Sequence, residues 1–211
     1  MNKWLTLCFV LFVSTLTGCG DITTQAIYSP LDSPHYQLKT DKNVHIRKVV
    51  DSRGIKEEVY FYDEEDLCHG TYDRPVADIV HEAIVSEFES FGFTIMAAED
   101  SLSSDALVFE CEITAFDVML TSGRLGNRFF EASANLTFAF YKPNKNELIS
   151  IRKRTSSVSI PKTNRIKEYN FIADTKAVRQ GGERLLSEVL PAVIRQELAS
   201  NKHLINTSNL N

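Results

Sequence analysis

Apolar residues at intervals of three and four positions predict an amphipathic helix over Val76–Phe91. The residues on this stripe are Val76, Ile79, Val80, Ala83, Ile84, Phe88 and Phe91. Asp73 is placed to cap the first turn, Pro75 suits that turn, and Gly92 suits the end of the helix. One face of this helix is therefore expected to cover the core.

A period of two residues predicts long strands over Ala106–Leu120 and Phe129–Tyr141. The apolar positions of the first strand are Leu107, Phe109, Cys111, Ile113 and Ala115, and those of the second are Phe130, Ala132, Ala134, Leu136, Phe138 and Phe140. Strict alternation indicates one buried face and one solvated face. In a third strand, Glu147–Ile160, the apolar positions change parity, which predicts a bulge near Arg152–Thr155.

Shorter patterns complete the predicted elements. Val44–Val50 is rich in Val and Ile and predicts a strand, Glu57–Tyr62 predicts a short strand, and the acidic Asp63–Asp73 a loop. A terminal helix is predicted over Ile172–Leu198.

The terminal helix contains three residues that weaken helices. Gly181 and Gly182 indicate close packing against the first helix or the sheet, because glycine otherwise disfavours a helix. Pro191 predicts a kink near Ser187.

The order strand, helix, three strands, helix predicts an α+β fold, β-α-β-β-β-α. A crossover joins the first strand to the strand after the helix, so these two should be parallel, and the later strands form an antiparallel meander. We expect a two-layer α/β sandwich, with a mixed, mostly antiparallel sheet of about four strands and two helices on one face. The predicted core contains Ile79, Ala83, Phe109, Ile113, Leu136, Phe138, Leu185 and Val189.

The N-terminus has the features of an export signal. A basic start precedes the 13 apolar-rich residues Trp4–Leu16, which are fewer than the roughly 20 that a membrane-spanning helix needs. Leu16-Thr17-Gly18-Cys19 resembles a bacterial lipobox, which implies cleavage after Gly18 and lipidation of Cys19. Gly20 in place of Asp favours the outer membrane by the same resemblance, with the inner membrane left open.

These signals divide the chain into four parts. We expect a lipoprotein signal peptide at 1–18, a lipid anchor and tether at 19–43, a single domain at 44–200 and a flexible tail at 201–211. The 211 residues carry 23 basic and 28 acidic side chains, a net charge of −5 that disfavours nucleic acid as a partner.

Candidate chemistry is sparse, and the sequence predicts no enzyme. Cys68 and Cys111 have two open interpretations, a disulfide or a core position for Cys111. The acidic stretch around Cys68 and His69 lacks the ligand spacing of a metal site, so we expect no metal and no cofactor.

Two groups of residues are candidate partner contacts. The basic group consists of Arg124, Arg128, Arg152, Lys153 and Arg154. These charges either guard an exposed strand edge against aggregation or receive an anionic partner. The last predicted strand lies at the free edge, so Arg152–Arg154 should face solvent. The aromatic run Tyr60, Phe61 and Tyr62 is either core or an exposed contact for a partner.

The whole pattern resembles the YajG-type family of bacterial lipoproteins, and more loosely LptE and the auxiliary lipoproteins of ABC transporters. The matching features are the lipobox, Asp51-Ser52-Arg53 after the first strand, and Phe91-Gly92-Phe93 after the first helix. The resemblance implies no catalytic residue. It predicts a membrane-anchored, periplasm-facing accessory protein that binds an envelope protein. The alternatives are an auxiliary subunit of an ABC transporter or lipid-transport assembly, and an envelope enzyme.

Overall fold

The computed structural model describes residues 22–28, 42–62, 69–97, 106–122, 128–142, 147–160 and 171–201, and its main sheet has five strands in the order β5-β2-β6-β7-β8. The strands are β2 (Asn43–Asp51), β5 (Thr94–Ile95), β6 (Leu107–Ser122), β7 (Arg128–Lys142) and β8 (Glu147–Ile160). β2 pairs with β6 in parallel, and β6, β7 and β8 form an antiparallel meander, as predicted. β8 lies at the edge of this sheet, also as predicted.

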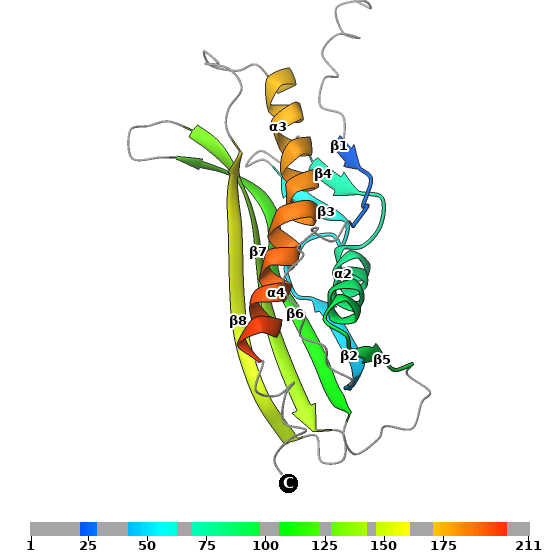
Figure 1. Ribbon diagram of the computed structural model, residues 1–211. Helices are drawn as coiled ribbons and strands as arrows, with labels where there is room; N and C mark the ends of the chain where they lie inside the picture. The colour runs from blue at the N-terminus through cyan, green and yellow to red at the C-terminus, as the bar shows by residue number, and fades with distance from the viewer. Residues whose placement is uncertain are drawn as a thin grey trace, which may run out of the picture.

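Helices cover one face of the main sheet (Figure 1). They are α2 (Val76–Ser90) and a long C-terminal helix made of α3 (Phe171–Arg184), the π-helical segment η1 (Leu185–Val189) and α4 (Leu190–Ser200). This arrangement is the predicted α+β sandwich. All eight predicted core residues are buried, from Ile79 in α2 to Val189 in η1.

The ends of α2 agree with the sequence at one terminus and differ at the other. Gly92 follows the helix with a positive φ of 90°, a conformation that glycine adopts without a Cβ clash. Asp73 was predicted to cap the start, but α2 has no side-chain cap there. The Asp73 carboxylate instead accepts a hydrogen bond from the Ala26 backbone N–H at 3.0 Å, so its oxygen is used by another segment.

The C-terminal helix leaves α geometry one turn before Pro191. Proline has no N–H, so Pro191 cannot donate to the carbonyl of Ser187. The chain forms the π-helical segment η1 at this position. The helix therefore departs from α geometry around Ser187, where a kink was predicted, and the departure takes the form of a π-helical segment.

A second, three-stranded sheet was not predicted. It has the order β1-β4-β3, with β1 (Ile22–Thr24) parallel to β4 (His69–Tyr72) and β3 (Val59–Tyr62) antiparallel to β4. β1 falls in the segment expected as tether, and β4 in the segment expected as loop. Strands of three and four residues carry too little alternation to stand out from a loop in the sequence.

The two glycines of α3 explain how the helix fits against both sheets. A Cβ on Gly181 would lie 2.7 Å from Val118 Cγ2, and one on Gly182 would lie 2.7 Å from Tyr60 Cζ. The close packing predicted from these glycines is therefore against strands β6 and β3. The Tyr72 hydroxyl also donates to the Gly182 carbonyl oxygen at 2.8 Å.

Two bulges change the predicted faces of the strands. The β6–β7 register shifts between Ile113 and Ala115, so Phe116 and Val118 are buried after the bulge where the alternation predicted Ala115. The β7–β8 register shifts between Phe140 and Tyr141 of β7, so Ile149 of β8 has no paired residue in β7. The bulge predicted near Arg152–Thr155 is therefore in the wrong place.

Candidate interaction surface

The three basic residues of β8 do not all face solvent. Lys153 is exposed, but Arg154 pairs with Leu136 of β7 and points to the helix side of the sheet. Arg154 Nε donates to Glu197 Oε2 of α4 at 2.6 Å, and both side chains are largely buried. The prediction that Arg152–Arg154 all face solvent is therefore wrong for Arg154.

Glu197 determines the position of Arg154. Its side chain is 2% exposed, so a carboxylate there is stable only with a charged or hydrogen-bonded partner. Arg154 provides the charge, and Asn201 Nδ2 donates to Glu197 Oε1 on the same helix. Arg152 Nη1 donates to the Ser200 carbonyl oxygen at 3.3 Å, so two of the three basic residues bind the end of α4.

The other two basic candidates add little to this surface. Arg124 lies outside the described residues, and Arg128 begins β7, where its backbone pairs with Ser122. The structure brings Arg152, Lys153 and Arg154 together on β8, and only Lys153 of these presents an exposed charge.

The aromatic run divides between core and surface. Tyr60 is fully buried, exchanges a hydrogen bond with the Thr24 hydroxyl at 2.8 Å, and packs on Tyr72 with ring centroids 4.6 Å apart. Phe61 points to the other side of β3 and meets Phe130 of β7, with centroids 6.1 Å apart. The core interpretation is therefore correct for these two rings. Tyr62 is 54% exposed and retains the surface interpretation.

Cys111 is a buried core residue with a free thiol. Burial raises the pKa of this thiol far above its usual range, with a smaller contribution from Glu112. Cys68 lies outside the described residues. Of the two open interpretations, the core position is the one that Cys111 takes in this structure.

Arg53 has a structural role that the sequence did not reveal. Its guanidinium forms a bidentate pair with Asp51, with Nε–Oδ1 at 2.8 Å and Nη2–Oδ2 at 2.6 Å. Nη1 donates to the carbonyl oxygens of Val59 in β3 and Phe116 in β6. The Asp-x-Arg sequence at the end of β2 therefore joins the three-stranded sheet to the five-stranded sheet.

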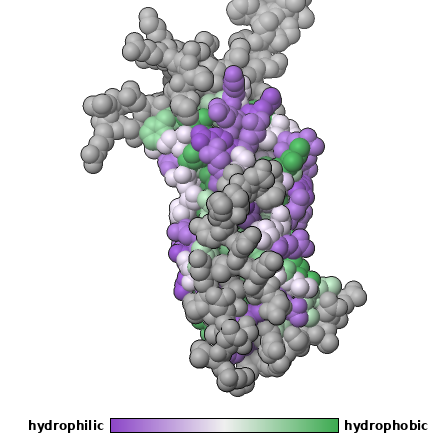
Figure 2. All heavy atoms as spheres, viewed as in Figure 1, coloured by the Kyte–Doolittle hydropathy of each residue, from purple (hydrophilic) through white to green (hydrophobic). Residues whose placement is uncertain are grey.

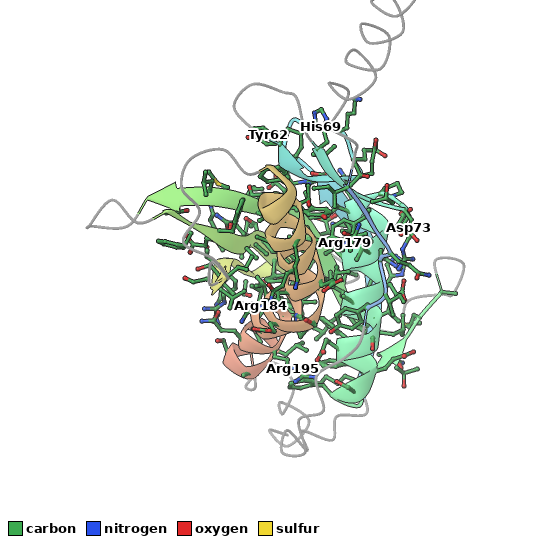
Figure 3. All side chains as sticks on the ribbon, turned by 90° about the horizontal axis from the view of Figure 1, so that it is seen from above. Tyr62, His69, Asp73, Arg179, Arg184 and Arg195 are labelled. Atoms are coloured by element: carbon green, nitrogen blue, oxygen red, sulfur yellow. The ribbon has the colours of Figure 1, made fainter. Side chains whose placement is uncertain are left out.

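Exposed apolar side chains occur at both ends of the main sheet. We define the β3–β4 end of the domain by two residue pairs, Tyr62–His69 of the three-stranded sheet and Leu120–Phe130 of the main sheet. Figure 3 shows Tyr62 and His69 next to each other on this part of the molecule. In the view of Figure 2, hydrophilic residues dominate the described surface around α3.

In the described parts of the chain, no group of three or more His, Cys, Asp or Glu residues is arranged to hold a metal ion. Among the same residues, no helix combines the length and hydrophobicity needed to cross a bilayer.

The fold resembles solved bacterial proteins. XCC0632 from Xanthomonas campestris, described with the family DUF330, has a TM-score of 0.54 and 14% identity, over 88% of this chain and 96% of its own. A minor lipoprotein from Acinetobacter baumannii has a TM-score of 0.43 and 13% identity, and the match covers 77% of this chain and 93% of that protein. CT253 from Chlamydia trachomatis has a TM-score of 0.47 and 12% identity, and the match covers 80% of this chain and 99% of that protein. The likeness to XCC0632 shows a shared fold.

No family model matches the chain, and no curated protein matches it by sequence. XCC0632 is described with the family DUF330 and not as a YajG-type or LptE protein. The resemblance to those particular families therefore stays a prediction.

Proposed function

We propose that the protein is a lipid-anchored lipoprotein of the bacterial cell envelope, whose domain faces the periplasm and acts by binding another envelope protein. The observation that carries this proposal is Leu16-Thr17-Gly18-Cys19 at the end of a short apolar segment. One acyl chain binds a membrane only marginally, whereas two or more chains anchor a protein firmly. Acylation of Cys19 through its sulfur and its new amine would give a firm anchor.

The use of the buried charges favours binding over catalysis. Three buried arginine–carboxylate pairs have structural roles: Asp51–Arg53, Glu87–Arg195 and Arg154–Glu197. The last two pairs join distant segments directly, and Asp51 holds Arg53 where it donates to the carbonyl oxygens of β3 and β6. A general acid or base has to reach a substrate proton, but each of these carboxylates already accepts a hydrogen bond from its arginine. Their chemistry stabilises the domain, which supports an accessory role.

The edge of β8 is the surface that best suits a protein partner. This strand of 14 residues ends the main sheet and carries the exposed Lys153 on its solvated face. An open strand edge binds an extended segment through backbone hydrogen bonds, and side chains along the edge select the partner. A lysine there disfavours pairing with a second copy of the same edge.

The lipid anchor is tested by replacing Cys19 with Ser and labelling cells with palmitate. The variant should take up no label and should keep the signal peptide, because the sulfur that receives the lipid is missing. Cys8→Ser is the matched control, since Cys8 lies within the apolar segment and its loss should leave labelling unchanged. Palmitate on the Cys19→Ser protein would show that the lipobox interpretation is wrong.

Location and partner are tested with the lipidated protein. Separation of inner and outer membranes on a density gradient should place it in the outer membrane. Crosslinking in cells, followed by purification of the tagged protein, should recover one envelope protein. Recovery of a transporter subunit would identify the auxiliary role, and loss of the crosslink in a Lys153→Glu variant would place the partner at β8.

A further inference from the structure

The chain between the predicted lipid and the folded domain is very short. Only Gly20 and Asp21 separate Cys19 from Ile22, the first residue of β1. A fully extended chain covers at most about 3.6 Å per residue, so Cys19 lies within about 11 Å of Ile22. A tether over the whole of 20–43 would have allowed several times that distance. The domain therefore has no room to stand off the membrane.

The position of β1 determines which part of the domain is held close to the lipid. Ile22 pairs with Gly70 of β4, and the neighbouring residue of β4, His69, pairs with Tyr62 of β3. The first residue of β1 is therefore at the β3–β4 end. Figure 1 shows β1 and the start of α3 at the same end of the molecule, far from the C-terminal end of α4.

Among the described residues of the β3–β4 end, three large apolar or aromatic side chains are exposed. Tyr62 is 54% exposed, and Met119 and Leu120 of β6 are 57% and 45% exposed. Leu120 belongs to this end because it pairs with Phe130, whose ring contacts Phe61 next to Tyr62. Tyrosine suits the membrane interface, since its ring is apolar and its hydroxyl stays hydrated.

We propose that the β3–β4 end of the domain rests on the phospholipid bilayer that holds Cys19, with Tyr62, Met119 and Leu120 inserted among the headgroups. This inference rests on the lipid anchor of the proposed function. The sequence next to these residues forms no basic cluster, since the acidic run Asp63–Asp66 follows Tyr62 and Arg124 is the one basic residue of 123–127. The contact is therefore apolar and does not require anionic lipid.

The processed protein offers a clean fluorescence test. Trp4, the one tryptophan of the sequence, is removed with the signal peptide, so a new tryptophan is a unique reporter. Leu120→Trp reports on the β3–β4 end. Leu148→Trp is the matched control, because Leu148 is 48% exposed and pairs with Tyr141 at the opposite end of the sheet. Tyr62→Trp is a second reporter at the β3–β4 end.

Each lipidated variant is reconstituted into phosphatidylcholine vesicles with brominated acyl chains, which quench nearby tryptophan. Flotation of the vesicles measures anchoring, and loss of emission measures contact. Tryptophan at 120 and at 62 should lose emission and shift to the blue, while tryptophan at 148 should emit as in buffer. Thermal unfolding of each variant identifies any variant that fails to fold. If either Leu120→Trp or Tyr62→Trp fails to fold, the other variant still reports on the β3–β4 end.

The outcomes separate the orientation from the anchor. If the protein floats with the vesicles but tryptophan at positions 120, 62 and 148 is quenched to the same extent, the orientation is overturned and the anchor stands. If the processed protein does not float, the anchor itself fails and the orientation fails with it. Quenching at 148 above that at 120 would show that the opposite end meets the membrane.

Discussion

Arg195 of α4 donates two hydrogen bonds to the fully buried carboxylate of Glu87 in α2, from Nε at 2.6 Å and from Nη2 at 3.0 Å. The Tyr28 hydroxyl donates a third bond to Glu87 Oε1 at 2.6 Å. Burial, together with this bond to a carboxylate, raises the pKa of the Tyr28 phenol above its usual range. One carboxylate therefore connects α2, α4 and the segment that follows β1.

Removing the arginine should be costly. Arg195→Met leaves the Glu87 carboxylate buried without its ion pair, and we expect a loss of about 3–5 kcal/mol in the free energy of unfolding, measured with urea. The double variant Glu87→Leu with Arg195→Met should recover most of that loss. Arg179→Met is the control, because Arg179 is exposed on α3 and should change stability by less than about 0.5 kcal/mol. Equal effects of the two arginine substitutions would contradict the prediction.

A methyl group at Gly182 should destabilise the domain. It would lie 2.7 Å from Cζ and 2.9 Å from Cε2 of Tyr60, a ring that is fully buried and hydrogen-bonded to Thr24. Overpacking costs about 1–3 kcal/mol, and contact with a rigid buried ring favours the upper part of this range, above the roughly 1 kcal/mol that a helix gains when alanine replaces glycine. Gly182→Ala should therefore lower the unfolding midpoint.

The neighbouring Glu183→Ala is the control for Gly182→Ala, since Glu183 is exposed. It should leave the midpoint almost unchanged. Tyr60→Leu combined with Gly182→Ala should be more stable than the sum of the two single changes predicts, because the smaller side chain makes room for the methyl group. A Gly182→Ala protein more stable than the parent would show that the helix does not lie this close to β3.

Adjacent basic residues of β8 should behave differently. Arg154→Gln leaves the Glu197 carboxylate without its arginine in a buried position, and should reduce the free energy of unfolding by about 3 kcal/mol. Lys153→Gln removes an exposed charge and should change it by less than about 0.5 kcal/mol. Urea unfolding of both variants checks this prediction. Equal losses would mean that Arg154 faces solvent as Lys153 does.

Cys111 should resist alkylation in the folded protein. Only the thiolate reacts, and burial raises the pKa of this thiol, so iodoacetamide should label Cys111 after denaturation and not before. Peptide mass spectrometry follows this site separately from the other cysteines. Labelling of the native protein would contradict the buried position. If denatured Cys111 reacts only after reduction, a disulfide with Cys68 forms in the protein.

The long periodic segments could be predicted from the sequence, because each carries enough positions to define a face. Every predicted apolar position of β7, from Phe130 to Phe140, is buried. The prediction for β6 fails after Ile113, since Ala115 continues the alternation in the sequence while the pairing with β7 places Phe116 in the core. Only the partner strand reveals that bulge.

The features missed at the candidate surface depend on contacts between distant residues. Arg154 is grouped with Lys153 in the sequence, but Glu197, 43 positions later, binds only Arg154 of the two. Tyr60 is part of an aromatic run for which the sequence allowed an exposed position, yet the helix packs on its ring at Gly182 and its hydroxyl bonds to Thr24. Local composition carries no information about such contacts, so the sequence left both interpretations open.

The parallel pairing of β1 with β4 has a mechanical consequence for a protein anchored at Cys19. Tension on the lipid would enter the domain at Ile22 and act along the axis of β1, across the pairs Ile22–Gly70, Thr23–Thr71 and Thr24–Tyr72. Bonds between parallel strands are evenly spaced, so a pull along the strand loads them together and does not open them one at a time. Beyond Thr24, the Ala26–Asp73 and Tyr28–Glu87 hydrogen bonds would carry the same load to α2. In a protein anchored in this way, a strand of only three residues would resist shear between the membrane and the domain.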